Sequence, residues 1–320
     1  MKARVFSFLR VIISISLIGL LFYIRRDSLS QIIGAIAELD ILIVISTIFL
    51  FFLTIFIMAY RFKTILWAKG LLLRFSEVLN LTFIGYFFNN FLPTAVGGDV
   101  VKAYYAYKKT DDKLNSFISV FMDRFMGFLS LFILAGASLI FSYRYVKSKP
   151  LITSLTIAVL FTLVLTLTLF FNRRLARLFL PLLPLVRRLN LKEKIERVYN
   201  NINAFRENRG LIAQTLLLSI AAQLVGFFII YILIKGMGSF ISLKMVLLLM
   251  PLVYIISMLP SINGLGIRES AIYFLFGPYV GYKTAFALSL VWLFMLFLVS
   301  VAGGVAYLFG GHYRNRVISA

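Results

Sequence analysis

The sequence LPTAVG at residues 92–97 and the sequence LPSING at residues 259–264 interrupt two apolar stretches, one in each half of the chain. Proline and glycine disfavour continuous helix, so each sequence predicts a break between two helices. Paired breaks in corresponding halves of a membrane protein indicate a binding or transport site. Charged residues follow both breaks closely, and we therefore expect the function of the chain to reside there.

The composition is typical of an integral membrane protein. Of the 320 residues, 61% are hydrophobic, and the mean hydropathy is +0.97, whereas soluble domains hold roughly 45–50% apolar residues. Continuous Leu, Ile and Phe runs predict an all-α polytopic fold rather than the alternating segments of a membrane β-barrel. Six stretches are long enough to span a bilayer as helices: Val5–Ile24, Ile41–Tyr60, Leu114–Tyr143, Leu151–Phe171, Leu211–Ile234 and Ala285–Phe309.

The chain offers few groups for catalysis or metal binding. It contains no cysteine, and its single histidine, His312, lies in the C-terminal tail. The sequence also shows no nucleotide-binding loop. We therefore expect no cofactor, no metal site and no enzymatic activity.

The net charge of +21 is explained first by membrane topology. The loop 172–210 carries ten basic residues against three acidic ones, so the positive-inside rule places it in the cytoplasm. Its alternation of basic and apolar residues predicts amphipathic helices that lie on anionic headgroups, rather than a nucleic-acid site. Counting crossings from this loop places both termini in the cytoplasm of a multi-pass protein of the cell membrane.

The same charge count decides how the two broken segments are arranged. Residues 75–101 are flanked by basic connections that both lie inside, and residues 245–282 are flanked by connections that both lie outside. We therefore expect six full spans and two re-entrant helical hairpins that enter from opposite faces, as in an inverted repeat. Eight spans satisfy the same count. The predicted parts of the single transmembrane domain 1–320 are half 1 (about 1–171), a cytoplasmic linker (172–210) and half 2 (about 211–311).

Both breaks should hold backbone that is not helical. Such backbone is tolerated at membrane depth only where protein or a water-filled cavity satisfies its polar groups. We therefore predict a polar cavity between the hairpins. The residues expected to open the backbone or to line the cavity are Asn90, Pro93, Gly97, Gly98, Pro260, Asn263, Gly264 and Gly266. The pair Gly303-Gly304 is instead expected to permit close helix packing.

A further pair of charges lies within a span. The helix that begins near Leu114 carries Asp123 and Arg124 about ten residues in, which at ~1.5 Å per residue is roughly 15 Å from its start. Ionisable residues at that depth face a protein interior or a wet cavity and pair with one another. The charged candidates are therefore Asp99, Lys102, Asp123, Arg124, Arg268 and Glu269.

Two interpretations of these charges stay open from the residues alone. In one, they only fix the hairpins, with Asp99 paired to Arg124 and Glu269 paired to Arg268 or Lys102. In the other, the three cations bind an anionic group of a substrate while the three acids hold them in place or contact a cationic substituent, and helix N-termini after the breaks contribute N–H donors for a phosphate.

Three motifs carry a family resemblance: FLPTAVGGD at 91–99 with Lys102, the pair DR at 123–124 followed by Gly127, and LPSINGLGIRE at 259–269. Together they resemble the flippase-like transmembrane domain of lysylphosphatidylglycerol synthases. The resemblance implies movement of a lipid or lipid-linked headgroup between leaflets. Full synthases continue into a soluble aminoacyl-transferring domain; this chain ends at Ala320, so we expect a stand-alone member that does not synthesise the lipid.

The function expected from the residues and the resemblance together is that of a lipid flippase or transporter. Its substrate would be a membrane lipid with an anionic phospholipid or polyprenyl-linked headgroup. The alternatives are a membrane-embedded transferase acting on a lipid carrier, with one of the acids as base, and a membrane partner of a separate lipid-modifying enzyme. A homo-oligomer is a further expected partner arrangement.

Overall fold

The computed structural model describes residues 14–24, 26, 32, 34, 36–92, 96–146, 208–259, 261 and 263–309, together with residues 154, 157, 158, 161, 162, 165 and 168. Within these ranges all regular structure is helical. The first residues of the predicted span Val5–Ile24, most of Leu151–Phe171 and nearly all of the basic loop 172–210 lie outside the described residues. The protein is an all-α membrane protein, as predicted.

Four helices are long and apolar enough to cross a membrane. They are α3 (Ile41–Ala68), α6 (Lys113–Val146), α11 (Arg209–Gly236) and α14 (Tyr282–Phe309). They confirm four of the predicted spans with longer bounds. The first N–H groups of a helix lack an intrahelical partner, and the side chains of Asp40 and Asn208 accept from them at the starts of α3 and α11.

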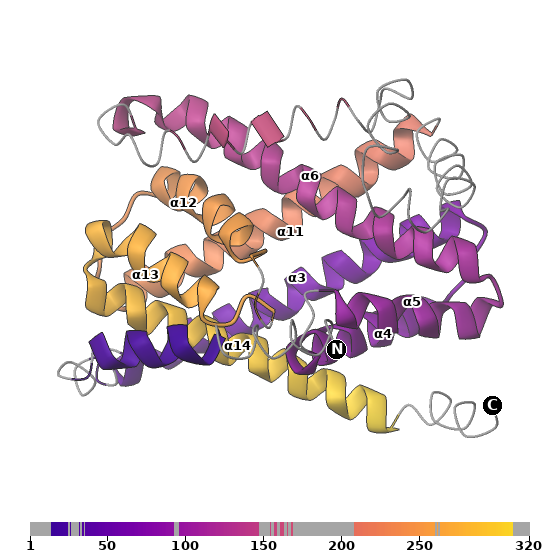
Figure 1. The fold of residues 1–320 in the computed structure, drawn as a ribbon, viewed down its shortest axis with the longest axis horizontal. Coiled ribbons are helices and arrows are strands. Elements are labelled where there is room, and N and C mark those ends of the chain that lie inside the picture. Colours follow the sequence, from indigo (N-terminus) through magenta and orange to yellow (C-terminus); the bar gives the residue numbers. More distant parts are fainter. Residues whose placement is uncertain are drawn as a thin grey trace.

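The remaining described helices are shorter. Helix α4 (Phe75–Phe91) is followed by α5 (Gly97–Thr110), and α12 (Leu243–Ile256) is followed by α13 (Ile267–Val280). A further apolar helix covers Ser14–Ile24. Each half of the chain therefore contains a long helix, two short helices separated by a break, and another long helix (Figure 1).

The helices α3 and α11 pack against each other in antiparallel directions. Gly236, at the end of α11, lies against Ile43 near the start of α3. Arg61, toward the end of α3, donates to Ser219 in the first half of α11. The ends of these two helices therefore lie at opposite ends of the bundle.

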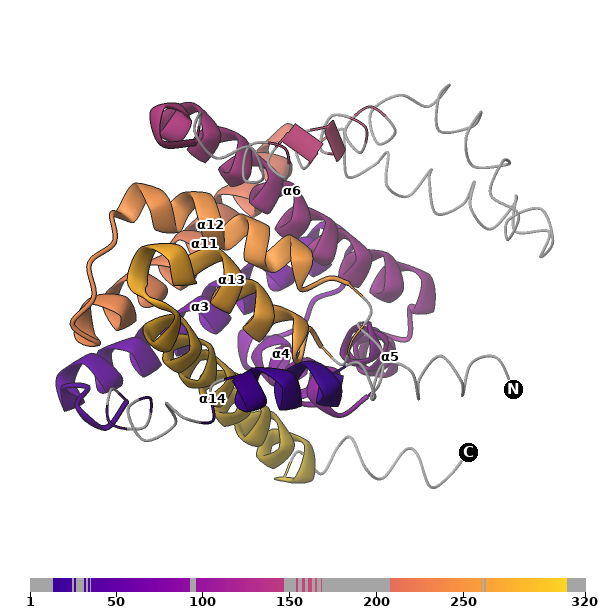
Figure 2. The same cartoon turned by 60° about the vertical axis from the view of Figure 1, so that its left-hand side comes forward.

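This antiparallel pair sets the position of both broken units. Helix α4 follows α3 directly, and Lys109 near the end of α5 forms an ion pair with Glu77 near the start of α4 at 2.7 Å. The α12–α13 unit follows α11 and returns beside its end, where Ser239 and Thr284 share a hydrogen bond of 3.0 Å. The start of α4 and the end of α5 therefore lie at one end of the bundle, and the start of α12 and the end of α13 lie at the other. Helices α5 and α12 lie on opposite sides in both views (Figures 1 and 2).

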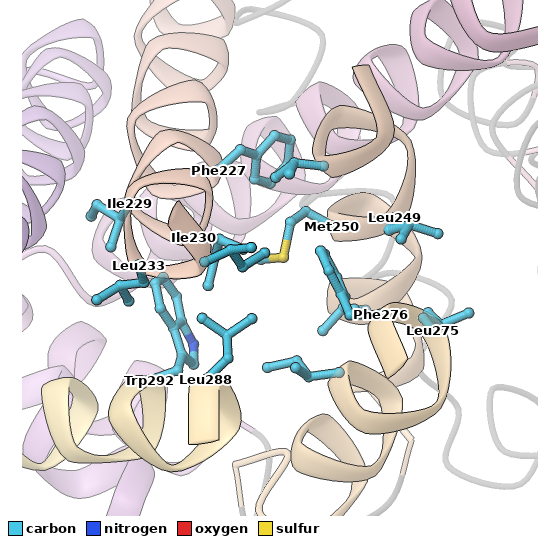
Figure 3. Close-up of a cluster of buried hydrophobic side chains, with 14 of the residues drawn as sticks. Phe227, Ile229, Ile230, Leu233, Leu249, Met250, Leu275, Phe276, Leu288 and Trp292 are labelled. Carbon is cyan, nitrogen blue, oxygen red and sulfur yellow. The ribbon is translucent and has the colours of Figure 1, made fainter. Parts of the chain in front are cut away.

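Long helices of one half cover short helices of the other. Helix α14 packs along α4, and α6 packs along α12. The main apolar core lies between α3, α11, α12, α13 and α14. Figure 3 shows part of it, where Phe227, Met250, Phe276 and Trp292, one from each of the last four helices, are buried together.

The contact of α14 with α4 depends on Gly303. A Cβ at this position would collide with the carbonyl oxygen of Phe83, and one at Gly304 would lie 2.9 Å from the Phe87 ring. The predicted role of this glycine pair in close helix packing is confirmed. Larger side chains would push the two helices apart.

We predict that Gly303→Val lowers the free energy of unfolding by about 2 kcal/mol, because an overpacked helix contact must shift its backbone. Thermal unfolding of the purified protein in detergent measures this. The matched control is Val301→Leu, two residues away on the exposed side of α14. Equal stability of the two variants would contradict the close contact.

Candidate functional site

The first break ends at Gly97, where α5 begins, and the conformation of its two glycines differs from the prediction. Gly97 and Gly98 are the first two residues of α5, so the expectation that they form open backbone is wrong. A Cβ on Gly98 would collide with the carbonyl oxygen of Gly85 in α4. Only glycine therefore allows α5 to start against α4, and Asn89 Oδ1 accepts the N–H of Gly98 at 2.9 Å. Pro93 lies outside the described residues.

A buried charge cluster joins α3, α5 and α6. Asp123 of α6 accepts from Arg61 Nε at 2.7 Å with one carboxylate oxygen and from Lys102 Nζ at 3.0 Å with the other. The side chains of Arg61, Lys102 and Asp123 are only 4%, 7% and 9% exposed. The alternative pairing of Lys102 with Glu269 is wrong, because the ammonium contacts Asp123 and lies 3.6 Å from the centre of the Phe62 ring.

Sequence reasoning missed Arg61 as a member of the site. The predicted span Ile41–Tyr60 ended one residue before it, whereas α3 continues to Ala68. The signal was present: no glycine or proline lies between Tyr60 and Gly70, and Phe62, Ile65 and Leu66 continue the apolar face. Two other helices also hold the guanidinium: Ser219 of α11 accepts from Nη1 at 2.8 Å, and Gly127 of α6 leaves room for the group.

Arg124 points to a different partner from its neighbour Asp123. Its Nε forms an ion pair with Asp99 in the first turn of α5, as predicted. The Arg124 side chain is 32% exposed, which makes it more accessible than Lys102 or Arg61. The two adjacent residues of α6 thus each hold α5 through one ion pair.

The second break is held by its own acid and base. Asn263, Gly264 and Gly266 have positive φ angles of 47°, 78° and 81°, a region that favours Gly and Asn, so the predicted open backbone is confirmed here. Glu269 accepts the N–H of Gly266 at 2.5 Å and thereby caps α13. Its other oxygen accepts from Arg268 at 2.8 Å, the predicted pair. Pro260 lies outside the described residues.

The two breaks meet inside the protein. The side-chain amide of Asn263, in the second break, donates to Asn90 Oδ1 at the end of α4. Asn90 also donates to the carbonyl oxygen of Leu296 in α14 at 3.4 Å. Two residues 173 positions apart in sequence are therefore in direct contact, and both belong to the predicted set.

Comparison with known proteins shows which family the chain matches. Residues 7–304 match the lysylphosphatidylglycerol synthase transmembrane region. The chain belongs to this family. It is 24% identical over 329 residues to a UPF0104 membrane protein of Pyrococcus horikoshii, a match that covers 94% of this chain and 96% of the relative. No solved structure matches the chain significantly.

The charges at the breaks do not balance in this member of the lysylphosphatidylglycerol synthase transmembrane family. Among the described residues, four cations face three acids: Arg61, Lys102, Arg124 and Arg268 against Asp99, Asp123 and Glu269. Among the residues that the structure describes, no three carboxylate or histidine side chains gather as metal ligands would. The arrangement can therefore attract an anionic group through its surplus positive charge.

We predict that Glu269→Gln destabilises the protein by about 3 kcal/mol, because it leaves the buried Arg268 guanidinium without its counter-charge. The midpoint of thermal unfolding in detergent checks this. Glu77→Gln is the matched control, since it removes an acid from a more exposed ion pair and should cost under about 1 kcal/mol. A Glu269→Gln variant as stable as this control would show that the Arg268 pair does not hold the second break.

Proposed function

We propose that the protein moves a lipid with an anionic phosphate headgroup between the two leaflets, with the headgroup passing where the two breaks meet. One observation carries the proposal: two helix–break–helix units from opposite ends of the bundle touch through Asn90 and Asn263. Buried or half-buried cations lie beside both breaks. A headgroup from either side would encounter the same polar region.

The lengths of the short helices support a re-entrant arrangement. Helix α4 has 17 residues and α5, α12 and α13 have 14 each. At ~1.5 Å per residue these lengths are roughly 25 Å and 21 Å, shorter than a ~30 Å hydrocarbon core. We infer that both units enter the membrane and return, from opposite faces, as the halves of an inverted repeat.

The charges at the bundle ends suggest the orientation. Lys63, Lys69, Arg74, Lys108 and Lys109 lie where α3 and α5 end and α4 starts. The positive-inside rule then places this end in the cytoplasm, with the α12–α13 unit entering from the outer face. In this orientation the α4–α5 unit is reached from the inner leaflet and the α12–α13 unit from the outer leaflet, and the two breaks meet between them.

The chemistry of the site suits a phosphate. Lys and Arg side chains are its usual protein ligands, and the N-termini of α5 and α13 begin at the two breaks and add a positive helix-dipole end to each. The acyl or polyprenyl chains would stay in the bilayer while the headgroup crosses. The surplus of one cation over the acids is matched by the single negative charge of a phosphodiester.

A transferase is less well supported by the same contacts. A general base must be able to take up a proton from its substrate. Asp99, Asp123 and Glu269 each already contact at least one cation, so a substrate proton would have to displace an ion pair before it could reach any of them. We therefore propose transport without chemistry at the headgroup.

The proposal is tested in proteoliposomes of phosphatidylcholine that contain traces of a fluorescent phosphatidylglycerol or of a labelled polyprenyl phosphate. Bleaching of the outer leaflet by dithionite reports how fast lipid crosses. We expect the protein to accelerate crossing of at least one phosphate-bearing lipid over empty liposomes. Equal rates with and without protein for both lipids would overturn the proposal.

We predict that Arg124→Gln slows this movement about tenfold, the effect of losing one charge-assisted hydrogen bond to a phosphate. The half-exposed side chain should allow the variant to fold, which its unfolding midpoint will confirm. The control is Lys63→Gln, which removes a cation that stacks on Trp67 away from the breaks. A rate unchanged by Arg124→Gln would remove this residue from the headgroup path.

A cross-link offers a test of motion, because the native chain has no cysteine. We predict that a short bis-methanethiosulfonate cross-linker joining Asn90→Cys to Asn263→Cys blocks lipid movement and that a reducing agent restores it, since a headgroup must separate the two breaks to pass. The control is the pair Ile43→Cys and Gly236→Cys, between the long helices α3 and α11. Unimpeded transport by the cross-linked breaks would contradict the proposed path.

A further inference from the structure

Asp123 forms ion pairs with two cations, although one would neutralise its charge. Its two carboxylate oxygens bind Arg61 and Lys102 separately, at 2.7 Å and 3.0 Å. One positive partner is sufficient to neutralise a buried carboxylate, whereas a buried carboxylate left with none is strongly unfavourable. Either cation can therefore leave Asp123 at a moderate cost, provided that the other stays.

The two cations differ in how firmly they are held. Arg61 belongs to the long helix α3 and contacts α6 and α11 as well, through Asp123 and Ser219. Ser219 is itself fixed by donating to the carbonyl oxygen of Thr215 at 2.7 Å. The guanidinium thus connects three long helices through two fixed acceptors, which makes it a poor candidate for leaving.

Lys102 is placed in the opposite way. It belongs to the short helix α5, one and a half turns after the first break, and its ammonium reaches Asp123 through a flexible stem. Its other neighbour is the face of the Phe62 ring, which attracts a cation without fixing its direction. Lys102 can therefore turn from Asp123 to another anion near the break.

We propose that Lys102 exchanges Asp123 for the phosphate of the lipid, and that Arg61 is the positioning residue that keeps Asp123 neutralised while this happens. The inference rests on the proposed function and adds an assignment of roles to it. Arg268 stays with Glu269, whose second oxygen caps α13. The exchange requires no new charge in the protein, because Arg61 and Asp123 remain a neutral pair.

Binding of dioctanoyl phosphatidylglycerol to the full chain in dodecyl maltoside tests the exchange, measured by calorimetry. In Arg61→Gln, Lys102 becomes the one remaining counter-ion of Asp123, so affinity should fall about tenfold. In Arg61→Gln with Asp123→Asn, no acid competes for Lys102, and affinity should recover to within about threefold of native. Arg61→Lys, which keeps the charge, should bind as the native chain does.

Recovery in the double variant separates this role from a structural one. If Arg61 only supports folding, removing Asp123 as well deletes a second native contact, and the double variant will bind no better than Arg61→Gln. That result overturns the inference. Lys102→Gln should abolish binding in both the native and the double-variant background. Lys109→Gln, which removes another paired lysine of α5, should leave it unchanged.

The failures of this inference and of the proposed function are distinguishable. If the native chain binds the lipid but does not move it between leaflets, the proposed function fails while recovery in the double variant still supports the exchange. If it moves the lipid and the double variant does not recover, the exchange alone fails. Native protein that neither binds the lipid nor moves it between leaflets overturns both.

Discussion

Open backbone within a bilayer is tolerated only where protein groups or a water-filled cavity satisfy its hydrogen bonds. Both breaks meet this constraint with side chains from their own flanks and from each other. Asn89 accepts the N–H of Gly98, and Glu269 accepts that of Gly266. The contact of Asn263 with Asn90 then joins the two breaks. The remaining helices, which pack across halves, hold these two ends in place.

Charge at the same depth follows a related rule. A charged side chain that is removed from water needs a partner of opposite sign, and each acid beside the breaks has one. The additional positive charge lies at Asp123, which contacts both Arg61 of the long helix α3 and Lys102 of the short helix α5. Because Arg61 stays on Asp123, Lys102 can bind an incoming anion and no charge is left unpaired.

Much of this arrangement could be predicted from the sequence. Long apolar runs predicted α3, α6, α11 and α14, and the pairs Asp99 with Arg124 and Arg268 with Glu269 were found through their proximity to the breaks. The role of Gly303 also followed from its place beside a second glycine in an apolar helix. These features depend on local pattern, on membrane depth and on charge, which the residues themselves display.

Other features depend on tertiary contacts that no local pattern displays. Basic residues after an apolar run ordinarily mark its end, so the predicted span ended at Tyr60 although α3 carries Arg61 into the core. Glycine occurs both in open backbone and where helices pack closely, so the sequence could not distinguish these roles for Gly97 and Gly98. The contact of Gly98 with Gly85 of α4 shows that close packing is the role here. Lys102 pairs with Asp123 because α5 packs against α6. The sequence alone does not show this packing, so Glu269 was considered as a partner as well.

The central claim is that both breaks lie at the middle of the membrane. Spin labels on Val96→Cys and Leu259→Cys, two exposed positions at the breaks, can be placed in depth by their collision rates with oxygen and with a water-soluble nickel complex in lipid vesicles. The account predicts that both labels lie roughly 15 Å from either surface of the ~30 Å core. Labels found at opposite surfaces would contradict it, because the two units would then cross the bilayer fully.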